Sequence, residues 1–336
     1  MSLAAIDGIA DALTATREFL FPVETGKWAR MAVVAFFVGG AGGTGSIGGG
    51  GNGGTDSAPA SGVPEVVVSD VLIAAFVAVL GVILLVGLLY AVLGAVMEFV
   101  LVESLRQDAV HLRQYVGRYW WPGLRLLGFR VGVGLLTLIT AVLVGGVAFL
   151  AAGGVGAADQ PARLLGVVLI AGPVLLAIGV GAALVLAFTT AFVVPVMLLE
   201  GTSVLGGWRR FWPTLRQAWK EYAAYVLVSV VLQFAVSLLV GLVFAILAVV
   251  VVVPFGALGL GVYLLAGGQF DPFTIAVLGG IGVVALSILV VVAAVVSVPV
   301  VTYFRYYALF VLGDTEPDFD VITERRDSVR NNEAGA

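Results

Sequence analysis

The chain has 336 residues, of which 61% are hydrophobic and only 11% are charged, and its formal net charge is −4. Roughly a quarter of the residues of a soluble globular protein are charged, so the composition excludes that class and indicates several membrane-spanning helices. With no cysteine and one histidine, His111, the chain excludes disulfides, thiol nucleophiles and histidine-rich metal sites. We expect no catalytic site, no metal and no cofactor, and membrane lipids but no nucleic acid as partners.

The N-terminal region combines an amphipathic segment with a short apolar one. Residues 3–20 place apolar Ile6, Ile9 and Leu13 opposite Asp7 and Asp11 at helical spacing, which predicts a helix lying along the membrane surface. The first span begins near Trp28, and its apolar part, 28–38, covers only roughly 16 Å at about 1.5 Å per residue. A linker rich in glycine, serine, threonine and proline is predicted for residues 39–69.

Further apolar stretches predict five more spans, at residues 70–102, 129–152, 164–199, 222–253 and 273–312, and we expect Pro254 to end the fifth span. The fold class is therefore all-α: an integral membrane bundle of six transmembrane helices. Spans two, four and six are overlong, since residues 164–199 would form a helix about 54 Å long against roughly 30 Å of hydrocarbon. Such helices either kink, with candidates at Pro173, Pro195 and Pro299, or protrude and need amphipathic segments as cover.

Three stretches with a proline, aromatic rings and basic residues, at 17–30, 118–130 and 210–222, each precede a pair of spans. They align on Pro22, Pro122 and Pro213 and predict three repeats, approximately 1–103, 104–200 and 201–312, each an amphipathic interfacial segment plus a helix pair. Within the third stretch, Trp208, Trp212, Leu215, Trp219 and Tyr222 follow helical spacing and predict one apolar face, and Pro213 either kinks the helix there or starts a new one. Residues 313–336 are expected to form an acidic, disordered cytoplasmic tail.

The basic residues are distributed very unevenly among the connections. Sixteen lie in the N-terminal segment, the second and fourth connections and the C-terminal region, against Arg163 alone in the others. Because positively charged connections stay inside, this predicts a multi-pass protein of the cell membrane with both termini in the cytoplasm.

The same side carries the tryptophans, which favour membrane interfaces, beside arginines that could contact anionic headgroups. The candidate lipid-contacting residues are Trp28, Arg30, Arg118, Trp120, Trp121, Arg125, Arg209, Arg210, Trp212, Arg216 and Trp219.

Two polar residues in the spans are candidate intramembrane sites. Glu98 is either part of an ion or proton relay or an interfacial carboxylate paired with an arginine of the next segment such as Arg106; its position near the cytoplasmic boundary favours the second interpretation. Gln233 either forms a hydrogen bond between helices or contacts a substrate.

The N-terminal pattern Phe21-Pro22, Trp28, Arg30 and residues 32–40 resembles an uncharacterised family of haloarchaeal membrane proteins. More distantly, the alternation of amphipathic segments and paired spans is similar to the six-helix membrane domain fused to glycerophosphodiester phosphodiesterases, whose catalytic domain is missing here. Neither resemblance implies catalytic residues. The expected role is therefore a non-enzymatic membrane protein that organises lipids or partner proteins through its cytoplasmic basic–aromatic face. The alternative is a small-solute transporter, because repeated helix pairs are common in transporters.

Overall fold

The structure is a computed structural model that describes residues 4–40, 70–154 and 161–334. All the elements in these ranges are helices. They are α1 (Ala4–Leu20), α2 (Thr25–Gly40), α3 (Asp70–Arg106), α4 (Leu112–Ala151), α5 (Pro161–Phe188), the π-helix η2 (Thr189–Val193), α6 (Val194–Glu200), α7 (Val204–Gln217), α8 (Trp219–Leu265), α9 (Pro272–Thr315), the 3-10 turn η3 (Pro317–Phe319) and α10 (Thr323–Ala334).

Five helical stretches of the described chain are long and apolar enough to cross a membrane, so the protein is a multi-pass helical membrane protein. They are Phe76–Arg106, Leu112–Ala151, Leu165–Glu200, Trp219–Leu265 and Pro272–Thr315. The first predicted span corresponds to α2, which has 16 residues and is not among the five. Most of the predicted linker, residues 41–69, lies outside the described residues.

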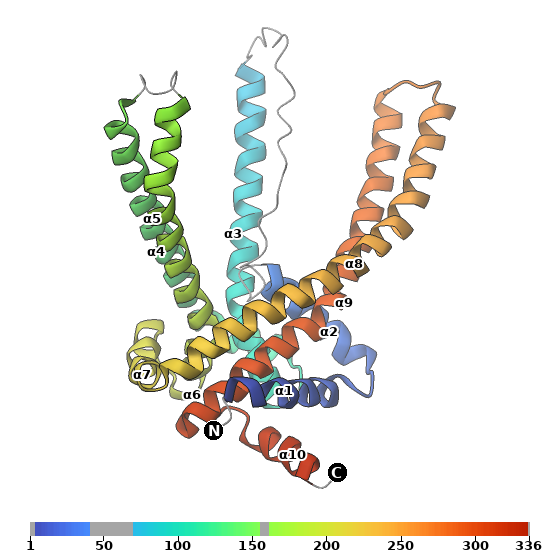
Figure 1. The fold of residues 1–336 in the computed structure, drawn as a ribbon. Helices are drawn as coiled ribbons and strands as arrows, with labels where there is room; N and C mark the ends of the chain where they lie inside the picture. The colour runs from blue at the N-terminus through green and yellow to red at the C-terminus, as the bar shows by residue number, and fades with distance from the viewer. Residues whose placement is uncertain (1–3, 41–69, 155–160, 335–336) are drawn as a thin grey trace.

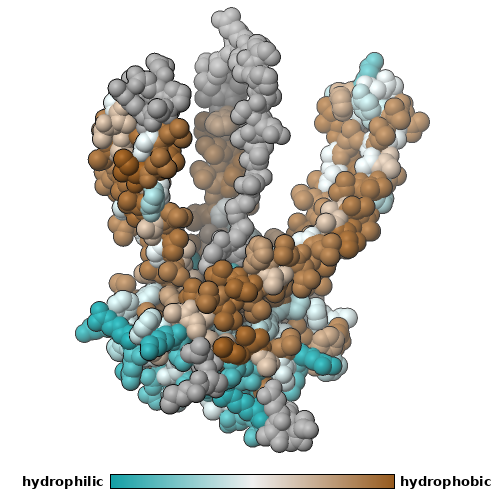
Figure 2. Space-filling view, viewed as in Figure 1, coloured by the Kyte–Doolittle hydropathy of each residue, from teal (hydrophilic) through white to brown (hydrophobic). Residues whose placement is uncertain are grey.

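The long helices form three arms that rise from one base and diverge (Figure 1). We call the upper parts of α3, of the α4–α5 pair and of the α8–α9 pair the first, second and third arm. The base contains the lower parts of these helices together with α1, α2, α6, α7 and α10. In the space-filling view the arms are hydrophobic, whereas hydrophilic residues gather over the underside of the base (Figure 2).

The base has its own hydrophobic core, which is built from the excess length of the spans. Every residue is buried in the stretches 94–105, 189–197 and 304–313, at the lower ends of α3, α5–α6 and α9. The prediction that protruding spans need amphipathic cover is confirmed at two places: α1 packs against α9, and α7 packs against η2 and α6. The excess length of the overlong spans is thus buried in the base.

Prolines interrupt the helices less than the sequence suggests. Pro122, Pro173, Pro254 and Pro299 all lie inside helices, so the expectation that Pro254 ends a span is wrong. Pro195 is different, because it follows the π-helix directly. A proline ring clashes with the carbonyl four residues earlier, and widening the preceding turn to a π-helix relieves that clash.

The interfacial segments also differ from the predicted pattern. Residues 118–130 are not a separate segment but part of α4. Of the two predicted effects of Pro213, a kink or a new helix start, the start is wrong, because α7 passes through Pro213 and ends at Gln217. Trp219 is exposed while Tyr222 is buried, so the five residues predicted to share one apolar face do not do so. The buried side of α7 consists of Val204, Gly207, Phe211 and Thr214.

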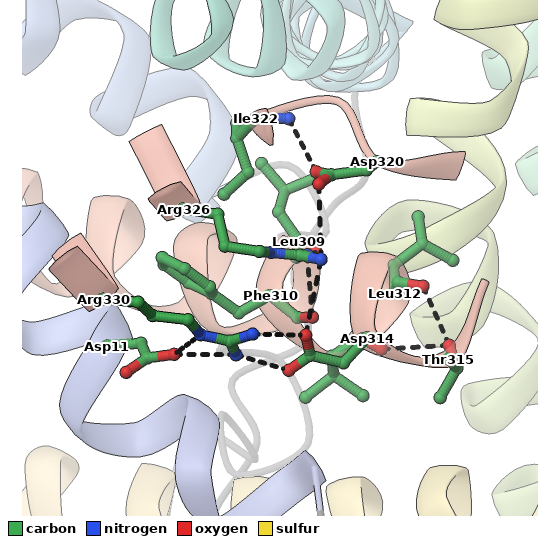
Figure 3. Close-up of polar contacts among 11 residues, drawn as sticks. Asp11, Leu309, Phe310, Leu312, Asp314, Thr315, Asp320, Ile322, Arg326 and Arg330 are labelled. Carbon is green, nitrogen blue, oxygen red and sulfur yellow. Dashed lines mark hydrogen bonds and ion pairs between the residues drawn. The ribbon is translucent and has the colours of Figure 1, made fainter. Parts of the chain in front are cut away.

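The C-terminal region folds back onto the base instead of forming the expected disordered tail (Figure 3). Arg330 on α10 forms ion pairs of 2.9 Å with Asp11 on α1 and 2.8 Å with Asp314 on α9. The hydrogen bonds that Arg330 donates, first to Asp314 and then to Asp11, raise the pKa of its guanidinium. Arg326 lies 3.3 Å from both Asp314 and Asp320. Five acidic and basic groups therefore hold α10 against α1, α9 and the segment between α9 and α10.

Candidate functional site

The most deeply buried charges of the base lie where the arms meet. Glu98 is fully buried on α3, within a stretch of apolar residues that form the core. One carboxylate oxygen accepts a hydrogen bond from Arg130 of α4 at 3.0 Å, and the other accepts one from Arg305 of α9. A single carboxylate thus contacts two guanidinium groups that come from two different arms.

Thr190 of the π-helix η2 completes this ion cluster. Arg130 also donates to the hydroxyl of Thr190 at 2.8 Å, and Arg305 donates to the carbonyl oxygen of Thr190 at 2.5 Å. Next to it, Thr189 accepts a hydrogen bond of 2.9 Å from the indole N–H of Trp208 on α7. The π-helix therefore presents two successive threonines, one to the ion cluster and one to the amphipathic helix beneath it.

The geometry of the cluster favours a structural clamp over acid–base chemistry. Both oxygens of Glu98 accept charge-assisted hydrogen bonds, which are about twice as strong as neutral ones and fix the position of the carboxylate. Because the three charged groups come from α3, α4 and α9, the cluster connects the three arms at their common origin. Removing one partner would leave another charge buried without compensation.

The prediction that Glu98 pairs with an arginine of the next segment is confirmed by Arg130, which lies in the predicted stretch 118–130. The arginine named as an example, Arg106, is not the partner and lies 3.8 Å from Glu103 instead. The second partner, Arg305 on the last long helix, was not predicted. Gln233 lies half-buried on α8 and forms none of the hydrogen bonds of this cluster.

Almost all of the predicted lipid-contacting residues lie on the surface of the molecule. Trp28 is half-buried and donates to the carbonyl oxygen of Leu20 at 3.0 Å. The other ten are exposed: Arg30, Arg118, Trp120, Trp121, Arg125, Arg209, Arg210, Trp212, Arg216 and Trp219. We call these eleven residues the basic–aromatic rim; their contact with lipid stays a prediction.

Some arginines of the rim already have partners within the protein. The guanidinium of Arg216 lies over the ring of Trp212 at 5.0 Å, and Arg210 forms an ion pair of 2.9 Å with Glu200. Both contacts are at the surface, where an ion pair contributes about 0–1 kcal/mol. Arg210 and Arg216 are therefore held only loosely and stay exposed.

A cavity of about 540 Å³ opens in the base between α3, α4 and the segment before α10. Its charged residues are of both signs: Arg106, Arg118 and Arg325 face Glu103, Asp320 and Glu324. Within the described ranges, no group of three or more histidine, cysteine, aspartate or glutamate residues could hold a metal ion.

Comparison with known proteins gives one match. The sequence model of a family of unknown function, DUF7544, matches residues 3–322. No curated protein and no solved structure matches the chain.

Proposed function

Because the chain belongs to DUF7544, a family of unknown function, we infer its role from its own residues. We propose that it is a non-enzymatic membrane protein that organises lipids at the cytoplasmic face of the cell membrane. In this proposal the base is cytoplasmic, both termini lie on that side, and the basic–aromatic rim contacts headgroups. Partner proteins are a second class of binder for the same surface.

The observation that carries the proposal is the divergence of the arms (Figure 1). Their apolar side chains are exposed: Phe76 and Leu85 on the first arm, Leu136 on the second and Phe234 and Leu264 on the third are all more than half exposed. Side chains of this kind in a membrane are surrounded by lipid tails. Arms separated by lipid anchor a base, whereas a transport pathway needs helices that pack around a polar route.

Six spans in three repeats also belong to the proposal. The sixth span would be α2, which packs against α3 and α9. The hydroxyl of Tyr90 on α3 donates to the carbonyl oxygen of Phe36 on α2 at 2.7 Å, which supports an α2–α3 pair equivalent to the α4–α5 and α8–α9 pairs. The haloarchaeal origin and the likeness to the phosphodiesterase-linked membrane domain remain predictions.

Small-solute transport is the alternative, and the buried carboxylate of Glu98 is the observation that favours it. An ionisable group near the membrane boundary can take part in ion or proton movement. Against this, two guanidinium groups occupy both oxygens of Glu98, so releasing the carboxylate for protonation would leave both cations uncompensated.

Lipid composition around the protein tests the proposal. The protein is extracted from membranes that contain phosphatidylglycerol and phosphatidylcholine in equal amounts, with a polymer that keeps the surrounding lipid, and the lipids are quantified by mass spectrometry. We expect phosphatidylglycerol to be enriched over its bulk share. A ratio equal to the bulk, together with solute-dependent swelling of liposomes that hold the protein, would favour the transporter instead.

A further inference from the structure

A basic cavity lies at the corner where α2 meets the beginning of α4. Its volume is about 360 Å³, and it is lined by Arg30, Val110, His111, Leu112, Arg113 and Gln114. Two of these side chains are arginines and two others, His111 and Gln114, can donate hydrogen bonds. No acidic side chain is among the described residues that line it. The cavity therefore carries a net positive charge, unlike the larger cavity of mixed charge nearby.

The neighbouring acid does not neutralise this cavity, because it is already paired elsewhere. Asp108 precedes the cavity in the chain, and its carboxylate lies 3.2 Å from the ammonium group of Lys27 and 3.9 Å from a guanidinium nitrogen of Arg325. Arg325 also lies 3.6 Å from Glu18, so Lys27, Arg325 and the two carboxylates balance one another and leave the charge of the cavity to Arg30 and Arg113.

Arg30 is held in place at the wall of the cavity. One of its guanidinium nitrogens donates to the carbonyl oxygen of Val110 at 3.1 Å, which fixes the side chain and leaves the other N–H groups of the fork for a ligand. The N-terminus of α4 also contributes positive potential through the helix dipole. No acidic side chain in the first turn offsets it, and His111 makes no side-chain capping hydrogen bond there. Arginine pairs of this kind suit phosphate oxygens, which they bind in bidentate geometry.

The depth of the cavity matches that of lipid phosphates. On α2, Arg30 directly precedes the apolar stretch 31–38, and on α4 the exposed rings of Trp120 and Trp121 follow Arg113 by about two turns, or roughly 12 Å along the axis. Tryptophan rings favour the membrane–water interface. A group bound at Arg30 and Arg113 would thus lie on the aqueous side of those rings, where headgroup phosphates are found.

We propose that this cavity binds one phosphate group through Arg30, Arg113, His111 and Gln114. The phosphate belongs either to the headgroup of an anionic phospholipid or to a free cytoplasmic phosphate compound. The first source rests on the lipid-organising function proposed above and gives it a defined binding site; the second does not depend on that function.

Native mass spectrometry and thermal unfolding of the full-length protein in mild detergent test the inference. The pocket variant is Arg30→Gln with Arg113→Gln, and the matched control is Arg17→Gln with Lys220→Gln, which makes the same charge change at exposed positions outside both the cavity and the basic–aromatic rim. Because Arg30 also contacts the backbone, Arg113→Gln alone serves as a second pocket variant. The probes are phosphatidylglycerol, added after delipidation, and inorganic phosphate, compared with chloride at matched ionic strength.

We expect the wild type and the control to retain one phosphatidylglycerol molecule, and both pocket variants to bind it at least about tenfold more weakly, since a hydrogen bond to a charged group contributes on the order of a factor of ten in affinity. If only inorganic phosphate stabilises the wild type, and the pocket variants lose that effect, the source is a free phosphate compound. Binding of neither probe, or equal loss in pocket and control variants, would overturn the inference. Enrichment of phosphatidylglycerol around the protein in the polymer-extracted sample would persist in that case if the proposed function is right.

Discussion

Glu98 of α3 and Arg305 of α9 are 207 residues apart in the chain and form a buried ion pair beneath the point where the arms diverge. Arg130 of the second arm contacts the other oxygen of the same carboxylate. These two ion pairs therefore link α3, α4 and α9 inside the apolar core of the base.

Neutralising Glu98 should destabilise the protein strongly. Glu98→Gln leaves Arg130 and Arg305 buried without a counter-charge, and breaking such an arrangement costs about 3–5 kcal/mol. Thermal unfolding in lipid nanodiscs measures this as a large fall in Tm. The control is Glu200→Gln, which removes one partner of the partly exposed pair with Arg210 and should change Tm little. Equal effects of the two substitutions would show that the cluster around Glu98 is not a clamp.

Adding a methyl group to Gly123 should push α3 and α4 apart. A Cβ atom at this position would lie 2.8 Å from the Cα atom of Val96, which is backbone and cannot rotate away. We expect Gly123→Ala to cost about 1–3 kcal/mol by overpacking. Gly117→Ala, on the same helix, meets nothing within 4 Å and should instead stabilise the helix by roughly 0.5–1 kcal/mol. Unfolding of both variants in nanodiscs gives the comparison, and a neutral Gly123→Ala would contradict the close approach of the two helices.

The sequence predicts the helical class and the excess length of the spans because both depend on local apolar runs. The helical state of α1 also follows from the periodicity of residues 3–20, but its packing side does not: Ala5, Ala12 and Phe19 are buried, whereas Ile6 and Leu13 of the predicted apolar side are exposed. The ends of the fifth span are not predictable in this way, because lipid and neighbouring helices tolerate a proline such as Pro254 inside a helix.

The pairing of Glu98 with an arginine of the next segment was predicted, but the second partner, Arg305, and the docking of α10 depend on contacts between distant parts of the chain, which local patterns do not reveal. Arg130 and Arg305 lie in or beside apolar runs and are easily assigned to membrane boundaries by their charge alone. Similarly, the acidic composition of the C-terminal region suggests solvation, although Asp314 and Asp320 are half-buried and pair with Arg326. A signal does exist for the first case, because a basic residue within an apolar stretch, such as Arg305 in α9, needs a counter-charge.

Reporter fusions should place the base in the cytoplasm. The distribution of basic residues predicts that a reporter after Gly201, between α6 and α7, is cytoplasmic, whereas one after Gly268, between α8 and α9, is extracytoplasmic. A third reporter, after Ser57, should also be extracytoplasmic if α2 crosses the membrane as the sixth span. A cytoplasmic reporter at Ser57 would mean that α2 does not span and that the first repeat differs from the others.

At high salt, the exposed tryptophan rings of the rim should anchor the base in the membrane more strongly than its arginine charges do. In molar salt the Debye length falls to about 3 Å, so the contribution of about 1 kcal/mol from each basic residue near anionic lipid is largely screened. We expect Trp212→Ala with Trp219→Ala to lower Tm in native-lipid nanodiscs more than Arg209→Gln with Arg216→Gln does. All four residues are exposed, so neither pair disrupts the core. A larger effect of the arginine pair would indicate a specific headgroup or partner site on α7.

Quenching of tryptophan fluorescence by brominated lipids tests most directly whether the basic–aromatic rim lies in the membrane interface. The six tryptophans all belong to the base, and Trp120, Trp121, Trp212 and Trp219 are exposed. Lipids brominated near the carbonyl end of the chain should quench this fluorescence more than lipids brominated near the methyl end, and Trp212→Phe with Trp219→Phe should reduce the difference. Absence of quenching by either lipid would place the rim in water and contradict the proposal that the base acts on the lipid surface.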